Sequence, residues 1–149
     1  MSIGKLNANQ GFTLIEVLIA IAILAVAVMG VFMVYTQCTA EIRRAKNRTT
    51  ATNYAQQMME MVASTPYDIL NYHGLTTLTD PPTDNPVRAD LLRWKANLQT
   101  FLTNAVGTIA VVKDQAISHA ILVTVTITYE NYGRKATSTL SLKIATSSP

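Results

Sequence analysis

The chain is poor in the residues that most sites of chemistry require. Its 149 residues include one cysteine, Cys38, and two histidines, His73 and His119. A single cysteine excludes an intrachain disulfide and a cysteine-rich zinc site. Neither histidine has a companion at ligand spacing, so we predict no metal site. No Ser, Cys or Asp stands with a recognisable general base and orienting group, so we predict no catalytic site, no cofactor and no enzymatic activity.

Charge is absent from residues 17–35, where only Gly30 interrupts an apolar series of 19 residues. At about 1.5 Å per residue this helix would be about 28 Å long, close to the hydrocarbon thickness of a bilayer. A buried core helix would show a polar face. A signal peptide would have a shorter apolar region and a small-x-small cleavage site, which YTQC at residues 35–38 is not. The sequence therefore predicts a membrane-spanning helix that stays attached.

One carboxylate, Glu16, stands at the start of the apolar segment, within GFTLIEVLIAIAIL at residues 11–24. An unpaired carboxylate near hydrocarbon costs several kcal/mol, so Glu16 is either solvated at headgroup level or paired for a function. The stretch resembles the processing site and N-terminal helix of type IV pilins and type II secretion pseudopilins. The resemblance rests on a polar leader ending in Gly11, an aromatic Phe12, then Glu16 and the apolar span.

This resemblance implies cleavage between Gly11 and Phe12 by a prepilin peptidase, which also methylates the new amino terminus. It implies a leader at residues 1–11, a transmembrane and assembly half of the helix at 12–35, and a periplasmic globular domain at 36–149. It also implies other pilin subunits, the prepilin peptidase/methyltransferase, the inner-membrane pilus assembly machinery and membrane lipid as partners.

Cleavage would supply a partner for Glu16, because the new amino group on Phe12 is a cation. In a low-dielectric helical bundle, Glu16 of one subunit and the amino group of a neighbour attract strongly, while either charge alone is costly. We therefore expect Glu16 to set the axial register of polymerisation.

The basic residues Arg43, Arg44, Lys46 and Arg48 follow the span, and Lys5 is the only charged residue before Glu16. Taken alone, the positive-inside rule places the C-terminal part in the cytoplasm. The resemblance implies the opposite: a single pass through the inner membrane with the C-terminal domain in the periplasm, and later a place in the pilus or pseudopilus. We follow the motif because it is more specific. We interpret the basic run as a solvated face of the helix. DNA capture and contact with lipid headgroups are the alternatives, but the run lacks the interleaved aromatic residues that single-strand binding favours.

The helical pattern continues beyond the span. Residues 36–64 contain neither Gly nor Pro, and Ala51, Ala55, Met58 and Val62 recur at helical spacing. Pro66 ends the segment, because the residue before a proline resists helix. The sequence predicts one continuous helix from about Thr13 to Ala63, with an amphipathic second half.

A loop at residues 66–87 and a second helix follow. We predict Asn85 as the N-cap of this helix, Pro86 as its first residue, an end near Val106, and Gly107 as its C-terminal cap. Its apolar face is expected to contain Leu91, Trp94, Leu98, Phe101, Leu102 and Ala105.

Strands are predicted at the C-terminal end. Apolar residues alternate over 121–130 and again over 140–144, a turn is expected at Asn131–Arg134, and a third strand covers 108–112. The predicted class is α+β: a long N-terminal helix packed on a small antiparallel sheet, with an extra helix.

The sequence NRTTAT at residues 47–52, followed by AQQMME at 55–60, resembles minor pilins of the PilV type. A lone cysteine and an apolar segment without proline depart from the pattern of major pilins and suit a minor subunit. The implied function is a structural subunit of a type IV pilus that takes part in filament assembly or initiation. Two alternatives are a type II secretion or competence pseudopilin, and a membrane-tethered periplasmic binding module that does not polymerise.

Overall fold

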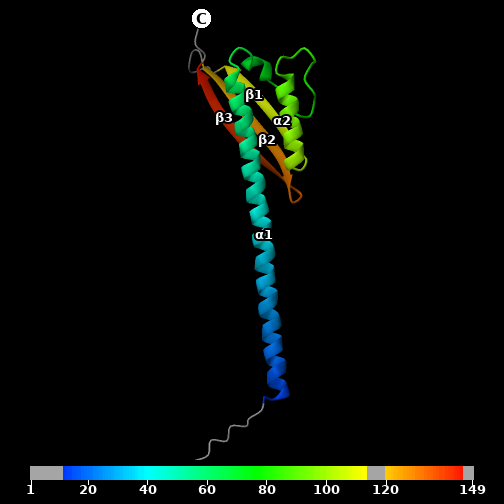
Figure 1. Cartoon of the computed structure of the whole chain (residues 1–149). Helices are drawn as coiled ribbons and strands as arrows, with labels where there is room; N and C mark the ends of the chain where they lie inside the picture. The colour runs from blue at the N-terminus through cyan, green and yellow to red at the C-terminus, as the bar shows by residue number, and fades with distance from the viewer. Residues whose placement is uncertain (1–11, 114–119, 146–149) are drawn as a thin grey trace, which may run out of the picture. The chain divides into compact units, whose positions relative to one another are not determined.

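The computed structural model describes residues 12–113 and 120–145 (Figure 1). Its elements are α1 (Leu14–Ser64), the 3-10 helix η1 (Ile69–Tyr72), α2 (Arg88–Phe101), β1 (Val106–Lys113), β2 (Ala120–Asn131) and β3 (Arg134–Ala145). This confirms the predicted α+β class. Internal contacts divide the chain into two units, one up to Ile42 and one from Arg43. Each is described separately below.

The first unit is the apolar part of α1. Every side chain from Phe12 to Cys38 is exposed within the chain, including all the large apolar ones. Gly30 does not interrupt the helix, and a Cβ added there would meet nothing within 4 Å. This helix is long and apolar enough to cross a membrane. So much exposed apolar surface requires a cover, either lipid or other helices.

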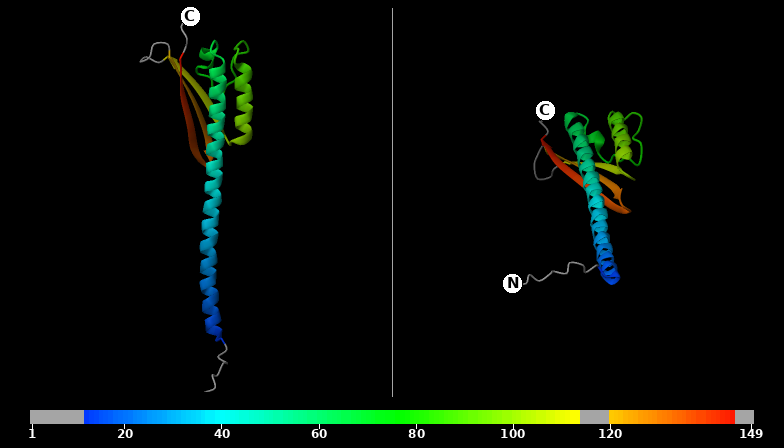
Figure 2. Two further views of the ribbon diagram at one scale, coloured as in Figure 1. Left: turned by 60° about the vertical axis from the view of Figure 1, so that its left-hand side comes forward. Right: turned by 60° about the horizontal axis from the view of Figure 1, so that its bottom comes forward.

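The second unit is built on an antiparallel sheet with the strand order β1-β2-β3. One face of β2 is buried throughout, as the alternation over 121–130 predicts for a half-buried strand, and it carries Ile121, Val123, Val125, Ile127 and Tyr129. Residues 43–64 of α1 and α2 cover this face (Figure 2). Ala51, Ala55, Met58 and Val62 supply the buried side of α1, as their spacing predicts.

The opposite face of the sheet carries hydroxyl side chains in register. Across β2 and β3, Thr124 lies opposite Ser141, Thr126 opposite Thr139, and Thr128 opposite Thr137. The hydroxyl oxygens of these pairs are 3.1, 3.4 and 3.5 Å apart. Cross-strand threonine pairs of this kind stabilise a sheet while leaving its face suited to water.

A two-residue turn joins β2 to β3, as predicted, with Asn131 paired to Arg134. Its central residues both have positive φ, 53° at Tyr132 and 71° at Gly133. This conformation matches the right-handed twist of the strands and favours Asn followed by Gly. A tyrosine at the first position is unusual, because its Cβ crowds the backbone there.

The predicted limits of α2 are wrong at both ends. The helix begins at Arg88 with Val87 as its N-cap, and Asn85 instead accepts a hydrogen bond from the Val87 amide through Oδ1, at 2.9 Å. It ends at Phe101, because Leu102 is extended and Asn104 takes the positive φ, 50°, that reverses the chain. Asparagine adopts this conformation more often than most residues other than glycine.

Gly107 is therefore not a helix cap. It lies within β1, directly beneath the indole ring of Trp94. An ideal Cβ on Gly107 would fall 2.2 Å from Trp94 Cη2, and the indole Nε1 donates to the Tyr54 carbonyl at 3.0 Å. The glycine is required because α2 packs this closely on the strand.

Phe101 is not part of the buried face either. Its side chain is 61% exposed and lies against the Tyr54 ring, with centroids 6.0 Å apart. The other five predicted residues, Leu91, Trp94, Leu98, Leu102 and Ala105, are buried.

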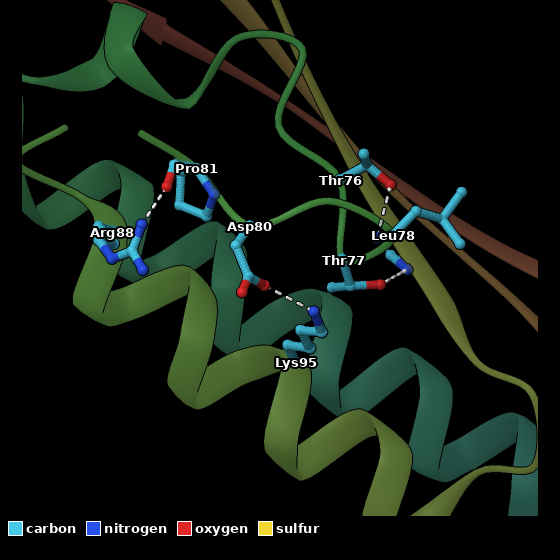
Figure 3. A network of polar contacts seen from close by, with 8 residues as sticks. Thr76, Thr77, Leu78, Asp80, Pro81, Arg88 and Lys95 are labelled. Atoms are coloured by element: carbon cyan, nitrogen blue, oxygen red, sulfur yellow. Dashed lines mark hydrogen bonds and ion pairs between the residues drawn. The ribbon is translucent and has the colours of Figure 1, made fainter. Parts of the chain in front are cut away.

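The segment between α1 and α2 closes the free edge of β1. Gly74 and Thr77 donate backbone hydrogen bonds to the carbonyls of Ile109 and Gly107, and Ile109 donates to Leu75. Figure 3 shows the polar contacts that fix the next residues. There Lys95 of α2 binds Asp80 at 2.7 Å, and Arg88 donates to the Pro81 carbonyl.

Candidate functional site

The helix α1 starts with a side-chain cap. Thr13 precedes the first helical residue, and its Oγ1 accepts a hydrogen bond from the Glu16 amide at 3.3 Å. Glu16 occupies the third helical position, where the helix dipole favours a negative charge. Thr-x-x-Glu is a sequence signature of a helix N-terminus, so Thr13 could have been identified from the sequence as well.

Phe12 and Glu16 lie on one face of the chain with apolar neighbours. A shallow groove there is lined by Phe12, Glu16, Val17, Ala20, Ile21 and Leu24. Phe12 is 83% exposed, and Glu16 is exposed as well. An exposed carboxylate beside an apolar groove, one turn from the predicted new amino terminus, has the layout needed for a charge pair between packed helices.

A second apolar groove lies further along α1. Its lining is Ala27, Gly30, Val31, Val34, Tyr35 and Cys38. The small side chains at Ala27 and Gly30 allow another helix to approach closely. Cys38 has a free thiol in the exposed part of the helix.

The remaining candidate residues from the sequence either stabilise the fold or lie outside the described residues. Gly11 and the leader at 1–11 lie outside them, and so does His119. His73 accepts a hydrogen bond from the Val111 amide through Nδ1 at 3.1 Å, which ties the loop to β1. Among the described residues, no group of three His, Cys, Asp or Glu side chains could hold a metal ion.

The basic residues that follow the apolar segment have different surroundings in the structure. The Arg44 guanidinium lies over the Tyr132 ring, 5.9 Å from its centroid. Burial raises the pKa of the Tyr129 hydroxyl, and the positive charge of Arg48 opposes that rise. Lys46 instead lines a groove with Tyr54 and Phe101. The sequence did not predict the contact of this run with the β2–β3 turn, because the two segments are more than 80 residues apart.

A buried tyrosine ties the connecting segment to α2. Tyr72 donates from its hydroxyl to Asp90 Oδ2 at 3.0 Å, and the Tyr72 hydroxyl oxygen accepts a hydrogen bond from Thr65 Oγ1 at 3.5 Å. Burial is the main cause that raises the pKa of Tyr72 to about 12. This group holds the connecting segment against α2.

An exposed apolar N-terminal helix with a carboxylate in its first turn, followed by a small α+β unit, is the arrangement that the resemblance to pilins implies. Comparison with family models gives the particular match: the prokaryotic N-terminal methylation motif, at residues 6–32. The match supports the type IV pilin and pseudopilin family, and with it a pilin-like structural role and anchoring in a membrane through the apolar helix. No curated protein and no solved structure matches the chain.

The motif ends at residue 32, before the segments at 47–60 that resemble minor pilins. The minor-pilin subtype therefore stays a prediction, and so do the individual roles of Gly11, Phe12 and Glu16.

Proposed function

We propose that this chain is a minor subunit of a type IV pilus, cleaved between Gly11 and Phe12 and built into a filament or its initiating complex. One observation carries the proposal: Glu16 stands at the start of a helix whose apolar side chains are all exposed, and both lie within the matching processing motif. Lipid alone would cover the apolar side chains, but it leaves the carboxylate without a partner.

The proposed mechanism of assembly divides the work between two interactions. Apolar surface along residues 12–35 drives helices together once they leave the lipid, and the grooves beside Ala20 and Gly30 let them pack closely. The carboxylate of Glu16 then pairs with the methylated amino group on Phe12 of a neighbour. Because a charge without a partner is costly in a dry bundle, only the register that joins the two is stable.

The orientation is part of the proposal. The leader stays in the cytoplasm, the chain crosses the inner membrane once, and the unit from Arg43 lies in the periplasm before assembly. Fusions of alkaline phosphatase and of a cytoplasmic reporter after Cys38 test this. Activity of the cytoplasmic reporter alone would refute the orientation and the pilin assignment with it.

The first experiment compares two substitutions in the same helical turn. Glu16→Gln removes the charge but keeps a side chain suited to this capping position, whereas Thr13→Ala removes the cap and keeps the charge. Incorporation into sheared filaments should fall about tenfold or more for Glu16→Gln and much less for Thr13→Ala. Normal incorporation of Glu16→Gln would refute the register role.

The second experiment measures processing. Intact mass of membrane-extracted protein should show loss of the eleven leader residues and one added methyl group, and Gly11→Ala should retain the full chain. Unaltered cleavage of that variant would refute the site assignment. An unprocessed wild-type chain, in cells with an active prepilin peptidase, would instead favour the tethered binding module.

A secretion or competence pseudopilin is the second candidate, because the same motif and exposed helix serve both kinds of filament. Deletion in the native host separates them: loss of surface fibres supports the pilus, while loss of protein export or DNA uptake supports the pseudopilus.

A further inference from the structure

One end of the second unit gathers basic side chains from two distant segments. We name this group the basic cluster; its members are Arg43, Arg44 and Arg48 from α1 and Arg134 and Lys135 from the start of β3. All five side chains are exposed. Their grouping is a product of the fold, since the sequence shows only the α1 half as a run.

Two contacts join the segments. Asn47 of α1 donates from Nδ2 to Asn131 Oδ1 at 3.3 Å, and Arg44 lies over the Tyr132 ring. The β2–β3 turn is thereby held beside the first turns of α1 in this unit. The turn cannot move away from the arginines without losing both contacts.

Three of the five positive charges in the cluster have no ion-pair partner among the described residues. Within the described chain, no carboxylate forms an ion pair with Arg43, Arg134 or Lys135. Glu130 lies opposite Lys135 in the strand register and forms no ion pair with it, but its carboxylate, which accepts a hydrogen bond from Asn104 at 2.7 Å, lowers the net charge of this end by one. A cluster of like charges of this kind attracts a polyanionic surface.

Tyr132 adds an aromatic side chain to the cluster at a conformational cost. It is 53% exposed and occupies a position of positive φ that favours Asn or Gly. A strained residue that serves no core packing points to a function. Exposed tyrosines beside Arg and Lys are typical of the membrane–water interface, where the ring meets the headgroups.

The position along the chain indicates which anion is in reach. Arg43 follows Tyr35, the last residue of the predicted span, by only eight residues of sequence. The surface potential of anionic lipid extends about 8–10 Å at physiological salt, and long basic side chains add to that reach.

We propose that the basic cluster and Tyr132 bind the headgroups of anionic phospholipids. They would hold the β2–β3 end of the globular unit at the membrane surface until the chain leaves the bilayer. The site requires the membrane span, but it does not depend on the Phe12–Glu16 pairing, so either proposal can fail without the other.

The test uses the full chain in nanodiscs of neutral phosphatidylcholine or of the same lipid with 30% phosphatidylglycerol. Amide hydrogen exchange is measured over the β2–β3 turn. Each basic residue at an anionic surface shifts the bound population by about fivefold, so the turn should exchange at least about fivefold more slowly in the anionic discs. The difference should vanish at 1 M salt, where the screening length is about 3 Å. Equal exchange in the two discs would overturn the proposal.

Charge-matched variants locate the site. The double variant Arg134→Gln/Lys135→Gln should abolish the slower hydrogen exchange of the turn in anionic discs. The control double variant Arg93→Gln/Lys113→Gln removes the same charge elsewhere and should preserve the slower exchange. Slowing that persists in the first pair would overturn the proposal. Tyr132→Asn suits the backbone conformation, so it should fold and still lose part of the slowing.

A nucleic acid is the competing polyanion. A 20-base-pair duplex added to the chain in neutral discs should leave turn exchange unchanged at 0.15 M salt. Slowing by the duplex, without slowing by phosphatidylglycerol, would assign the cluster to nucleic acid and overturn the lipid site.

Discussion

Replacing Gly107 by alanine should cost about 3 kcal/mol of unfolding free energy. The new methyl carbon would fall 2.2 and 2.4 Å from two carbons of the Trp94 indole. Trp94 is 1% exposed, so its ring can move only among buried neighbours, which are closely packed in a protein core. Overpacking of this kind costs about 1–3 kcal/mol. Displacing the ring also breaks the hydrogen bond from its Nε1 to Tyr54, worth about 1 kcal/mol.

The assay is urea unfolding of the full chain in detergent, followed by far-UV circular dichroism and by the fluorescence of Trp94, the sole tryptophan. A double-mutant cycle supplies the control. In a Trp94→Phe background, which circular dichroism alone must follow because the tryptophan is gone, the outer ring atoms are gone as well, so Gly107→Ala should cost at least about 1 kcal/mol less there. A cost below about 1 kcal/mol in the wild-type background, or the same cost in both, would refute the close-packing argument.

Three further predictions concern the same unit. Tyr72→Phe should destabilise the fold at neutral pH by removing the bond to Asp90; because burial raises the pKa of Tyr72 from 10.0 to about 12, the wild-type advantage in urea unfolding should shrink as pH rises from 10 to 12. The Lys95 ammonium lowers the pKa of Asp80 below 3.8, so the advantage of wild type over Asp80→Asn should be small, present above pH 3.8, and lost on further acidification; an advantage that grows in acid would contradict this. Asparagine suits the positive φ of residue 132 better than tyrosine does, so Tyr132→Asn should raise the free energy of unfolding by about 1 kcal/mol and with it the melting temperature. A lower melting temperature would show that the contact of Tyr132 with Arg44 outweighs the strain.

Most of the fold was predictable from the regular spacing of apolar residues along the helix and the strands. A helix without Gly or Pro from residue 36 to 64 leaves the chain no local reason to stop, and α1 ends within one residue of the predicted limit. The alternation over 121–130 has the period of a strand with one buried face, and all five inward residues are buried. Such patterns are dependable because burial of one face enforces them along the whole element.

The errors fall where a residue type suits two conformations. Gly107 fits a helix cap by type, but Asn104 already supplies the positive φ, and the glycine is needed for the contact with Trp94. Phe101 continues the helical spacing, yet it lies at the end of α2, where the chain leaves the core. Only tertiary packing decides between these alternatives.

The candidate sites also differ in how far the sequence alone predicts them. Phe12 and Glu16 are recognisable from the sequence, because the processing motif is local and contiguous, and their roles await the experiments above. The basic cluster is not recognisable from the sequence, because Arg44 and Tyr132 meet only when the β2–β3 hairpin folds back onto α1.

The hydroxyl-bearing face of the sheet has a consequence for how this protein can change over time. Each residue of β2 points either to the interior or to water, so Thr124, Thr126 and Thr128 can be exchanged without touching the valines and isoleucines between them. Replacement of such an outward residue by another strand-forming side chain alters stability by about 1 kcal/mol or less. What this face presents to its surroundings is therefore free to drift while the architecture beneath it persists.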